Sequence, residues 1–236
     1  FKLFSASKTV TALALGAYLY QNPTLKLETK VSTLVDLGTH IGDRPFASRD
    51  KISLFDLISM GTGLDWCEHA KCVAIDMIKA TYGKQNKDTL KYVLSKPMKT
   101  RPGKRYNYSS GNYMILEKLL KDHMGATKYK TFYQDFLFKP LGIKKATLET
   151  DGEGLIYGAS GVWLNNQDYS KIGQLIASRG VWKGQRLISD DFIETMMTPT
   201  PAAINASKAI RRTEGPVGAS LWTNRKLLVI VISCPE

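Results

Sequence analysis

The chain has 236 residues, of which 43% are hydrophobic, and this is enough to build one substantial core. Its formal net charge of +12 is scattered along the sequence without a nucleic-acid recognition motif, which favours a solvated, lysine-rich surface over a nucleic-acid partner. The longest aliphatic run, Leu227 to Ile232, is far too short to span a membrane. Because the chain begins at Phe1, without a methionine, we expect a piece truncated at both ends.

The first helix is predicted to open near Ser5 and to end at Asn22-Pro23. Its apolar residues recur at helical spacing and predict one buried face: Val10, Leu13, Ala14 and Ala17. Ser5 and Lys8 are three residues apart and so lie on the same side of the first turn. A serine becomes a nucleophile when a base takes its proton, and a lysine can be that base where burial and a helix N-terminus lower its pKa. The short pattern also arises by chance, so the rest of the chain must supply its context.

Two cysteines and a histidine fall within six residues, from Cys67 to Cys72. A structural zinc site needs four ligands and usually a Cys-x-x-Cys spacing, and no fourth ligand is placed nearby. We therefore expect ordinary loop residues first, a local Cys67–Cys72 disulfide second and a metal site last. We expect no metal and no cofactor.

The remaining elements follow from periodicity and capping signals. Short helices are predicted over residues 53–60, 76–82, 87–94, 112–124, 132–138, 166–178 and 190–197. Ser53 and Asp56 should form a capping box. The helix over 112–124 should bury Tyr113, Leu116, Leu119 and Leu120. Residues 198–209 contain two prolines and are expected to form a loop, and strands over 219–223 and 227–233 should pair as a hairpin.

Five stretches, in order, resemble those of the penicillin-recognising serine hydrolases: Phe4–Thr9, Asp56–Trp66, Pro102–Gly111, Pro140–Ile143 and Gly215–Trp222. The likeness is to the class C β-lactamase-like branch, which includes esterases and D-alanyl-D-alanine carboxypeptidases, and within it to the 6-aminohexanoate-dimer hydrolases. It implies an α/β (α+β) fold of the β-lactamase/transpeptidase type, with an antiparallel sheet flanked by helices. It also implies a single domain over residues 1–236, with a mostly helical region over about residues 43–154.

The resemblance implies that Ser5 is the nucleophile, Lys8 its base and Tyr108 the tyrosine that relays protons to and from the leaving group. A phenol beside an ammonium can shuttle a proton, because the cation favours the ionised phenol. The nearby Tyr106 and Tyr113 are expected to be structural. The implied activity is hydrolysis of a small ester or amide through an acyl-enzyme, without nucleic acid, metal or cofactor. By the resemblance alone, the location would be periplasmic or secreted.

Four further residues are expected to contact the substrate, and they depart from the family pattern: Ser110, Glu214, Gly215 and Pro216. Ser110 stands where the family's Tyr-x-Asn motif has an amide, which both donates and accepts. Thr213-Glu214-Gly215 stands where many relatives carry Lys-Thr-Gly or His-Thr-Gly, and the Glu214 carboxylate would repel an anionic substrate. Both changes favour esters or other amides over β-lactams.

Pro216 bears on the oxyanion hole. The resemblance implies that the backbone N–H just after Gly215 joins the N–H of the nucleophile in the oxyanion hole, but Pro216 stands there and proline has no N–H. Losing one donor costs about 2.7–4 kcal/mol of transition-state stabilisation. Either Val217 donates instead, or the hydrolase is weak, or the protein is a binding or regulatory protein on the same scaffold.

Overall fold

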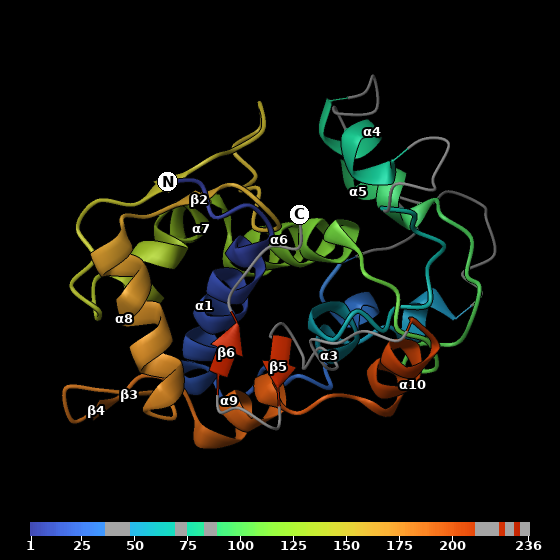
Figure 1. Ribbon diagram of the computed structural model, residues 1–236. Helices are drawn as coiled ribbons and strands as arrows, with labels where there is room; N and C mark the ends of the chain where they lie inside the picture. Colours follow the sequence, from blue (N-terminus) through green and yellow to red (C-terminus); the bar gives the residue numbers. More distant parts are fainter. Residues whose placement is uncertain (36–47, 69–74, 83–88, 211–221, 225–228, 232–236) are drawn as a thin grey trace.

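A computed structural model describes residues 1–35, 48–68, 75–82, 89–210, 222–224 and 229–231 (Figure 1). Helix α1 (Ser7–Gln21) runs through the middle of the molecule, and every residue from Ser7 to Tyr18 is buried. The sequence pattern predicted one buried face, whereas α1 is buried on all sides. Small side chains allow this close packing, since a Cβ on Gly16 would lie 2.5 Å from the ring of Phe192.

The helical region follows α1 in the chain. It contains α3 (Leu54–Ile58), α4 (Asp76–Tyr82), α5 (Thr89–Leu94), α6 (Ser110–Met124), α7 (Ala126–Tyr133) and a π-helical turn (Gln134–Phe138). Three single 3-10 turns lie at Phe4–Ala6, Val31–Thr33 and Arg49–Lys51. The predicted Ser53–Asp56 capping box is confirmed, with Ser53 Oγ accepting from the Asp56 N–H at 3.2 Å.

Helices α6 and α7 follow each other directly and are separated by Gly125 alone. The four residues predicted for the core face of α6 are all at most 2% exposed. Gly125 has a φ of +81°, which favours glycine, and it lets the chain turn and begin α7 at once. The sequence analysis placed a helix only from residue 132 and therefore missed most of α7.

The described strands are short and pair antiparallel, as expected. Strand β1 (Thr147–Leu148) pairs with β2 (Val162–Trp163), and Lys2 extends this sheet by a bridge to Trp163. Strands β3 (Val181–Trp182) and β4 (Gln185–Arg186) form a tight hairpin. Strands β5 (Trp222–Asn224) and β6 (Val229–Val231) pair in the region where the sequence predicted the last hairpin.

Three helices complete the described chain: α8 (Asn166–Ala177), α9 (Asp190–Met197) and α10 (Pro201–Ile210). The loop expected over residues 198–209 is wrong, because most of it is α10. Proline is tolerated at the first helical position, where its missing N–H has no partner to lose. Thr200 Oγ1 accepts from the Ala203 N–H at 3.1 Å and caps the helix start. None of the helices in the described ranges is long and apolar enough to cross a membrane.

Candidate active site

A sharp strand-to-helix turn presents Ser5. The Leu3 N–H donates to the Val162 carbonyl at 2.9 Å, so the first residues lie along β2. Phe4 then takes a φ of +44°, and the chain passes through a 3-10 turn into α1. A left-handed conformation at a bulky residue is strained and persists only where the surroundings enforce it. Ser5, half-buried, therefore lies at the tip of an enforced bend at the start of α1.

Lys8 lies one turn further along α1 and is only 3% exposed. Its Nζ donates to Ser5 Oγ at 3.2 Å and to the Ala159 carbonyl at 3.0 Å. A buried amine needs such acceptors to offset the loss of water. The structure thus brings together the two residues that the i, i+3 spacing paired in the sequence.

Tyr108 reaches this pair from the segment just before α6. Its ring centroid lies 5.0 Å from Lys8 Nζ, and the ring of Tyr113 lies at 6.0 Å, both within cation–π range. Tyr108 directly precedes Ser109, which caps α6 by accepting from the Asn112 N–H at 3.3 Å. The N-termini of α1 and α6 therefore converge on Lys8. The fully buried Tyr113 fits the structural role expected for it.

The segment from Gly158 to Val162 forms the wall behind α1. Thr11 Oγ1 donates to the Gly158 carbonyl at 2.8 Å, next to the Ala159 carbonyl that holds Lys8. Ser7 Oγ accepts from the Val162 N–H at 3.1 Å. Three side chains of α1 thus hold this wall by its backbone.

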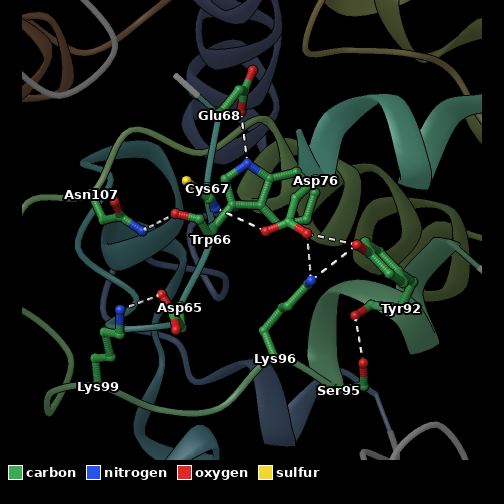
Figure 2. A network of polar contacts seen from close by, with 10 residues as sticks. All are labelled: Asp65, Trp66, Cys67, Glu68, Asp76, Tyr92, Ser95, Lys96, Lys99 and Asn107. Atoms are coloured by element: carbon green, nitrogen blue, oxygen red, sulfur yellow. Dashed lines mark hydrogen bonds and ion pairs between the residues drawn. The ribbon is translucent and has the colours of Figure 1, made fainter. Parts of the chain in front are cut away.

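Ser110, expected to contact substrate, is fully buried and bonded to Glu68. Its N–H and its Oγ each donate to the Glu68 carboxylate at 2.6 Å. Trp66 Nε1 donates to the same carboxylate at 2.7 Å (Figure 2). A carboxylate is well placed at the positive end of α6. Both donor groups of Ser110 are thus engaged with Glu68, and the side chain of Ser110 is covered in this arrangement.

The buried carboxylate of Asp76 anchors the segment that carries Glu68 (Figure 2). Asp76 accepts from the Cys67 N–H at 2.8 Å and from Tyr92 Oη at 2.6 Å, and it forms an ion pair with Lys96. Burial raises the pKa of Asp76, but the hydrogen bonds from Lys96, Tyr92 and the Cys67 N–H outweigh it, so the net shift is downward. Asp76 is thus held as an anion that fixes Cys67 beside Glu68.

Cys67 is disulfide-bonded, so the first-ranked expectation of an ordinary loop residue is wrong for it. Cys72 and Cys234, the other two cysteines of the chain, lie outside the described residues. Glu214, Gly215 and Pro216 also lie outside them. Within the described ranges, no cluster of three or more His, Cys, Asp or Glu residues could hold a metal ion.

The sequence analysis missed two features of this site. The pairing of Glu68 with Ser110 spans 42 residues, and no local pattern signals it. The Ala159 carbonyl is a backbone group, so no side-chain pattern in the sequence identifies it as a partner of Lys8.

The family model for Beta-lactamase matches residues 1–215. The chain belongs to the beta-lactamase family. A comparison with curated protein sequences found no match.

Solved structures share the fold. A penicillin-binding protein from Bacillus halodurans superposes with a TM-score of 0.70 at 15% identity, covering 98% of this chain and 72% of that one. A protein from Bacteroides dorei DSM 17855 assigned as a beta-lactamase gives 0.66 at 20% identity, covering 93% and 64%. One from Bacillus anthracis assigned as a 6-aminohexanoate-dimer hydrolase gives 0.65 at 16%, covering 98% and 65%.

These likenesses confirm the β-lactamase/transpeptidase-like fold expected from the resemblance. The chain spans 64% of the length of the Bacteroides dorei protein and 65% of that of the Bacillus anthracis protein. At such identities the shared fold does not specify a substrate.

Proposed function

We propose that this protein is a serine hydrolase that cleaves a small ester or amide through an acyl-enzyme. Ser5 is the nucleophile, Lys8 its base and Tyr108 the proton relay. The observation that carries the proposal is the contact of 3.2 Å between Lys8 Nζ and Ser5 Oγ, made under the ring of Tyr108. Nucleophile and base within hydrogen-bond reach, with a third group that orients the base, are the marks of an activated serine.

The arrangement supports a reaction in two steps, acylation of Ser5 and hydrolysis of the acyl-enzyme. In its neutral form Lys8 takes the Ser5 proton as Oγ attacks the substrate carbonyl carbon. The bond to the leaving alcohol or amine then breaks, and the proton reaches the leaving group through Tyr108. Water attacks the resulting ester of Ser5 by the same relay in reverse, which frees the acid and restores the Ser5 hydroxyl.

The Ala159 carbonyl has a defined part in this scheme. It is the second acceptor of Lys8 Nζ, at 3.0 Å, and it comes from a segment 151 residues away in the sequence. A lysine chain has four rotatable bonds and would otherwise sample many positions. This contact therefore holds Nζ against Ser5 Oγ before substrate arrives, which lowers the entropic part of the barrier.

The substrate class follows from the residues that flank the nucleophile. Glu68, which accepts from Ser110, places a carboxylate near the start of α6. Glu214, one of the residues expected to contact the substrate, would supply a second carboxylate. Both disfavour a substrate with a carboxylate at that end. The neighbour assigned as a 6-aminohexanoate-dimer hydrolase is named for an amide substrate, which agrees with an ester or amide class.

Covalent labelling with a fluorophosphonate tests the proposal. Mass spectrometry of the digested adduct should place the label on Ser5, and Ser5→Ala should abolish it. Ser170, exposed on α8, is the matched control, and Ser170→Ala should label like the parent. Equal labelling of Ser5→Ala and the parent would remove the assignment. Labelling of Ser5 without turnover of any ester or amide would favour a binding or regulatory protein.

A further inference from the structure

Behind Lys8 lies a carboxyl group that the reaction does not use. Glu117 projects from α6 into the core and is 0% exposed. Its Oε2 contacts the hydroxyl of Tyr129 at 2.6 Å, and its Oε1 contacts the hydroxyl of Tyr133, both from α7. Among the residues that the structure describes, no cation pairs with this carboxyl group to compensate a buried charge.

The two tyrosines connect Glu117 to the wall of the active site. The Tyr133 hydroxyl contacts Thr11 Oγ1 at 2.6 Å, and Thr11 Oγ1 contacts the Gly158 carbonyl at 2.8 Å. Gly158 also lies directly against the carboxyl, since a Cβ there would be 2.0 Å from Glu117 Oε1. The next carbonyl is that of Ala159, which accepts from Lys8 Nζ. A continuous set of contacts therefore runs from Glu117 to the base.

Tyr129 holds the other end of the same wall. Its hydroxyl oxygen accepts from the Ile156 N–H at 3.0 Å. Burial and the neighbouring carboxyl raise the pKa of Tyr129, and likewise that of Tyr133, so both keep their protons. Asp151, further along the chain, also faces Tyr129. On α1, the charged residue nearest in sequence to Thr11 is Lys8, one turn before it.

The protons available do not suffice if Glu117 is ionised. Four contacts need a side-chain O–H proton: Tyr129 to Oε2, Oε1 to Tyr133, Tyr133 to Thr11, and Thr11 to the Gly158 carbonyl. The three hydroxyl groups carry one proton each, and a carboxylate and a carbonyl carry none. A proton on Glu117 Oε1 supplies the fourth. Every contact is then a hydrogen bond, directed from Glu117 through Tyr133 and Thr11 to Gly158.

We propose that Glu117 is protonated in the working protein and is a positioning residue for Lys8, acting through Tyr133, Thr11 and the Gly158–Ala159 backbone. The inference rests on the proposed role of Lys8 as base. Independently of the proton count, burial raises the pKa of Glu117 to about 7, although contacts of the carboxylate form with the Tyr129 and Tyr133 hydroxyl groups act in the opposite direction. Above that pH Glu117 loses its proton, so three protons remain for the four contacts. One of the contacts between Glu117 and the Gly158 carbonyl can then no longer be a hydrogen bond.

Substitutions at Glu117 separate positioning from simple packing. Glu117→Gln carries an N–H where the protonated acid has O–H and a C=O that accepts from Tyr129, so it keeps all four hydrogen bonds at every pH. Glu117→Leu keeps volume but leaves the hydroxyl groups without their partner. We expect the leucine variant to acylate Ser5 more slowly and the glutamine variant to restore the rate.

The pH profile of fluorophosphonate labelling at Ser5 is the decisive readout. As pH rises through about 7, the rate for the parent relative to Glu117→Gln should fall about fivefold, the factor that one neutral hydrogen bond is worth. In a Thr11→Val background, which interrupts the path, parent and Glu117→Gln should give the same profile. Coincident profiles of the two proteins with Thr11 present would overturn the inference.

Infrared spectroscopy tests the proton without requiring activity. Below pH 7, the parent should show the carbonyl stretch of a protonated carboxyl group that Glu117→Gln lacks. If that band is absent, the inference is wrong even where Ser5 is labelled. If the band is present but Ser5 is not labelled, the proposed function fails while the protonated Glu117 stands, and its role toward a base is withdrawn.

Discussion

Lys8 and Thr11 lie one turn apart on α1 and hold two successive carbonyls of the same segment. Lys8 Nζ donates to Ala159 at 3.0 Å and Thr11 Oγ1 to Gly158 at 2.8 Å. The position of the candidate base is therefore coupled to a backbone segment about 150 residues away, in addition to its helical neighbour Ser5. This coupling connects the buried Glu117 network to the candidate active site.

The pH dependence of stability follows from Glu117. Its pKa is raised from 4.5 to about 7 in the folded protein, so the native state binds more protons than the unfolded state between these values. The free energy of unfolding should therefore fall as pH rises from 4.5 to about 7, by at most about 3 kcal/mol. Urea unfolding across this range measures the slope, and Glu117→Gln should remove that component. Identical slopes for parent and variant would contradict the assignment.

The hydrogen bonds of Glu68 should stabilise the packing of residues 66–68 against the start of α6. Glu68→Ala removes the acceptor of the Ser110 N–H, of Ser110 Oγ and of Trp66 Nε1. We expect the free energy of unfolding to drop by about 1–3 kcal/mol, the cost of leaving buried donors unpaired. Urea unfolding provides the measurement, with Glu153→Ala on the surface as the control. A loss no larger than that of the control would show that water replaces Glu68 without cost.

Short acyl esters should be cleaved faster than penicillins. Glu68 accepts from Ser110, and the family register, if it holds, would add the Glu214 carboxylate to the substrate site, so acceptors and negative charge would disfavour an anionic β-lactam. Initial rates with p-nitrophenyl acetate and with a penicillin, measured on the same preparation, make the comparison. A penicillin turned over faster than the ester would reverse this expectation.

Substitution of Pro216 tests whether the oxyanion hole is complete. If the family register holds at this position, the oxyanion hole lacks one backbone donor, and Pro216→Ile should raise kcat/KM for a short ester about 10²-fold. If Val217 already supplies the donor, the same change should leave the rate constant nearly unaltered. Steady-state kinetics on parent and variant separate the two, and an unaltered rate would rule out the degraded oxyanion hole.

Local patterns predicted the parts of the site that depend on neighbours in sequence. Ser5 and Lys8 share one helical turn, and the Ser53–Asp56 cap spans three residues, so spacing alone paired them correctly. Glu117 was within reach of the same reasoning. It follows Tyr113 by four residues and precedes Leu120 by three, which places it on the face predicted to be buried.

Contacts between distant segments were out of reach of the sequence. Glu68 meets Ser110, and Ala159 meets Lys8, only because the fold brings separate loops to helix N-termini. Helix α10 was missed for a different reason. Pro201 was read as a helix breaker, although proline at the first helical position loses no hydrogen bond.

The rate of acylation of Ser5 in Lys8→Met tests the central claim most directly. Methionine keeps most of the buried volume of lysine but has no basic nitrogen, so the general base is lost while packing is largely retained. Lys128→Met, on the exposed side of α7, is the matched control. The account predicts that fluorophosphonate labelling of Ser5 slows by about 10²-fold or more in Lys8→Met and is unchanged in the control. Labelling of a folded Lys8→Met protein at the parental rate would contradict it.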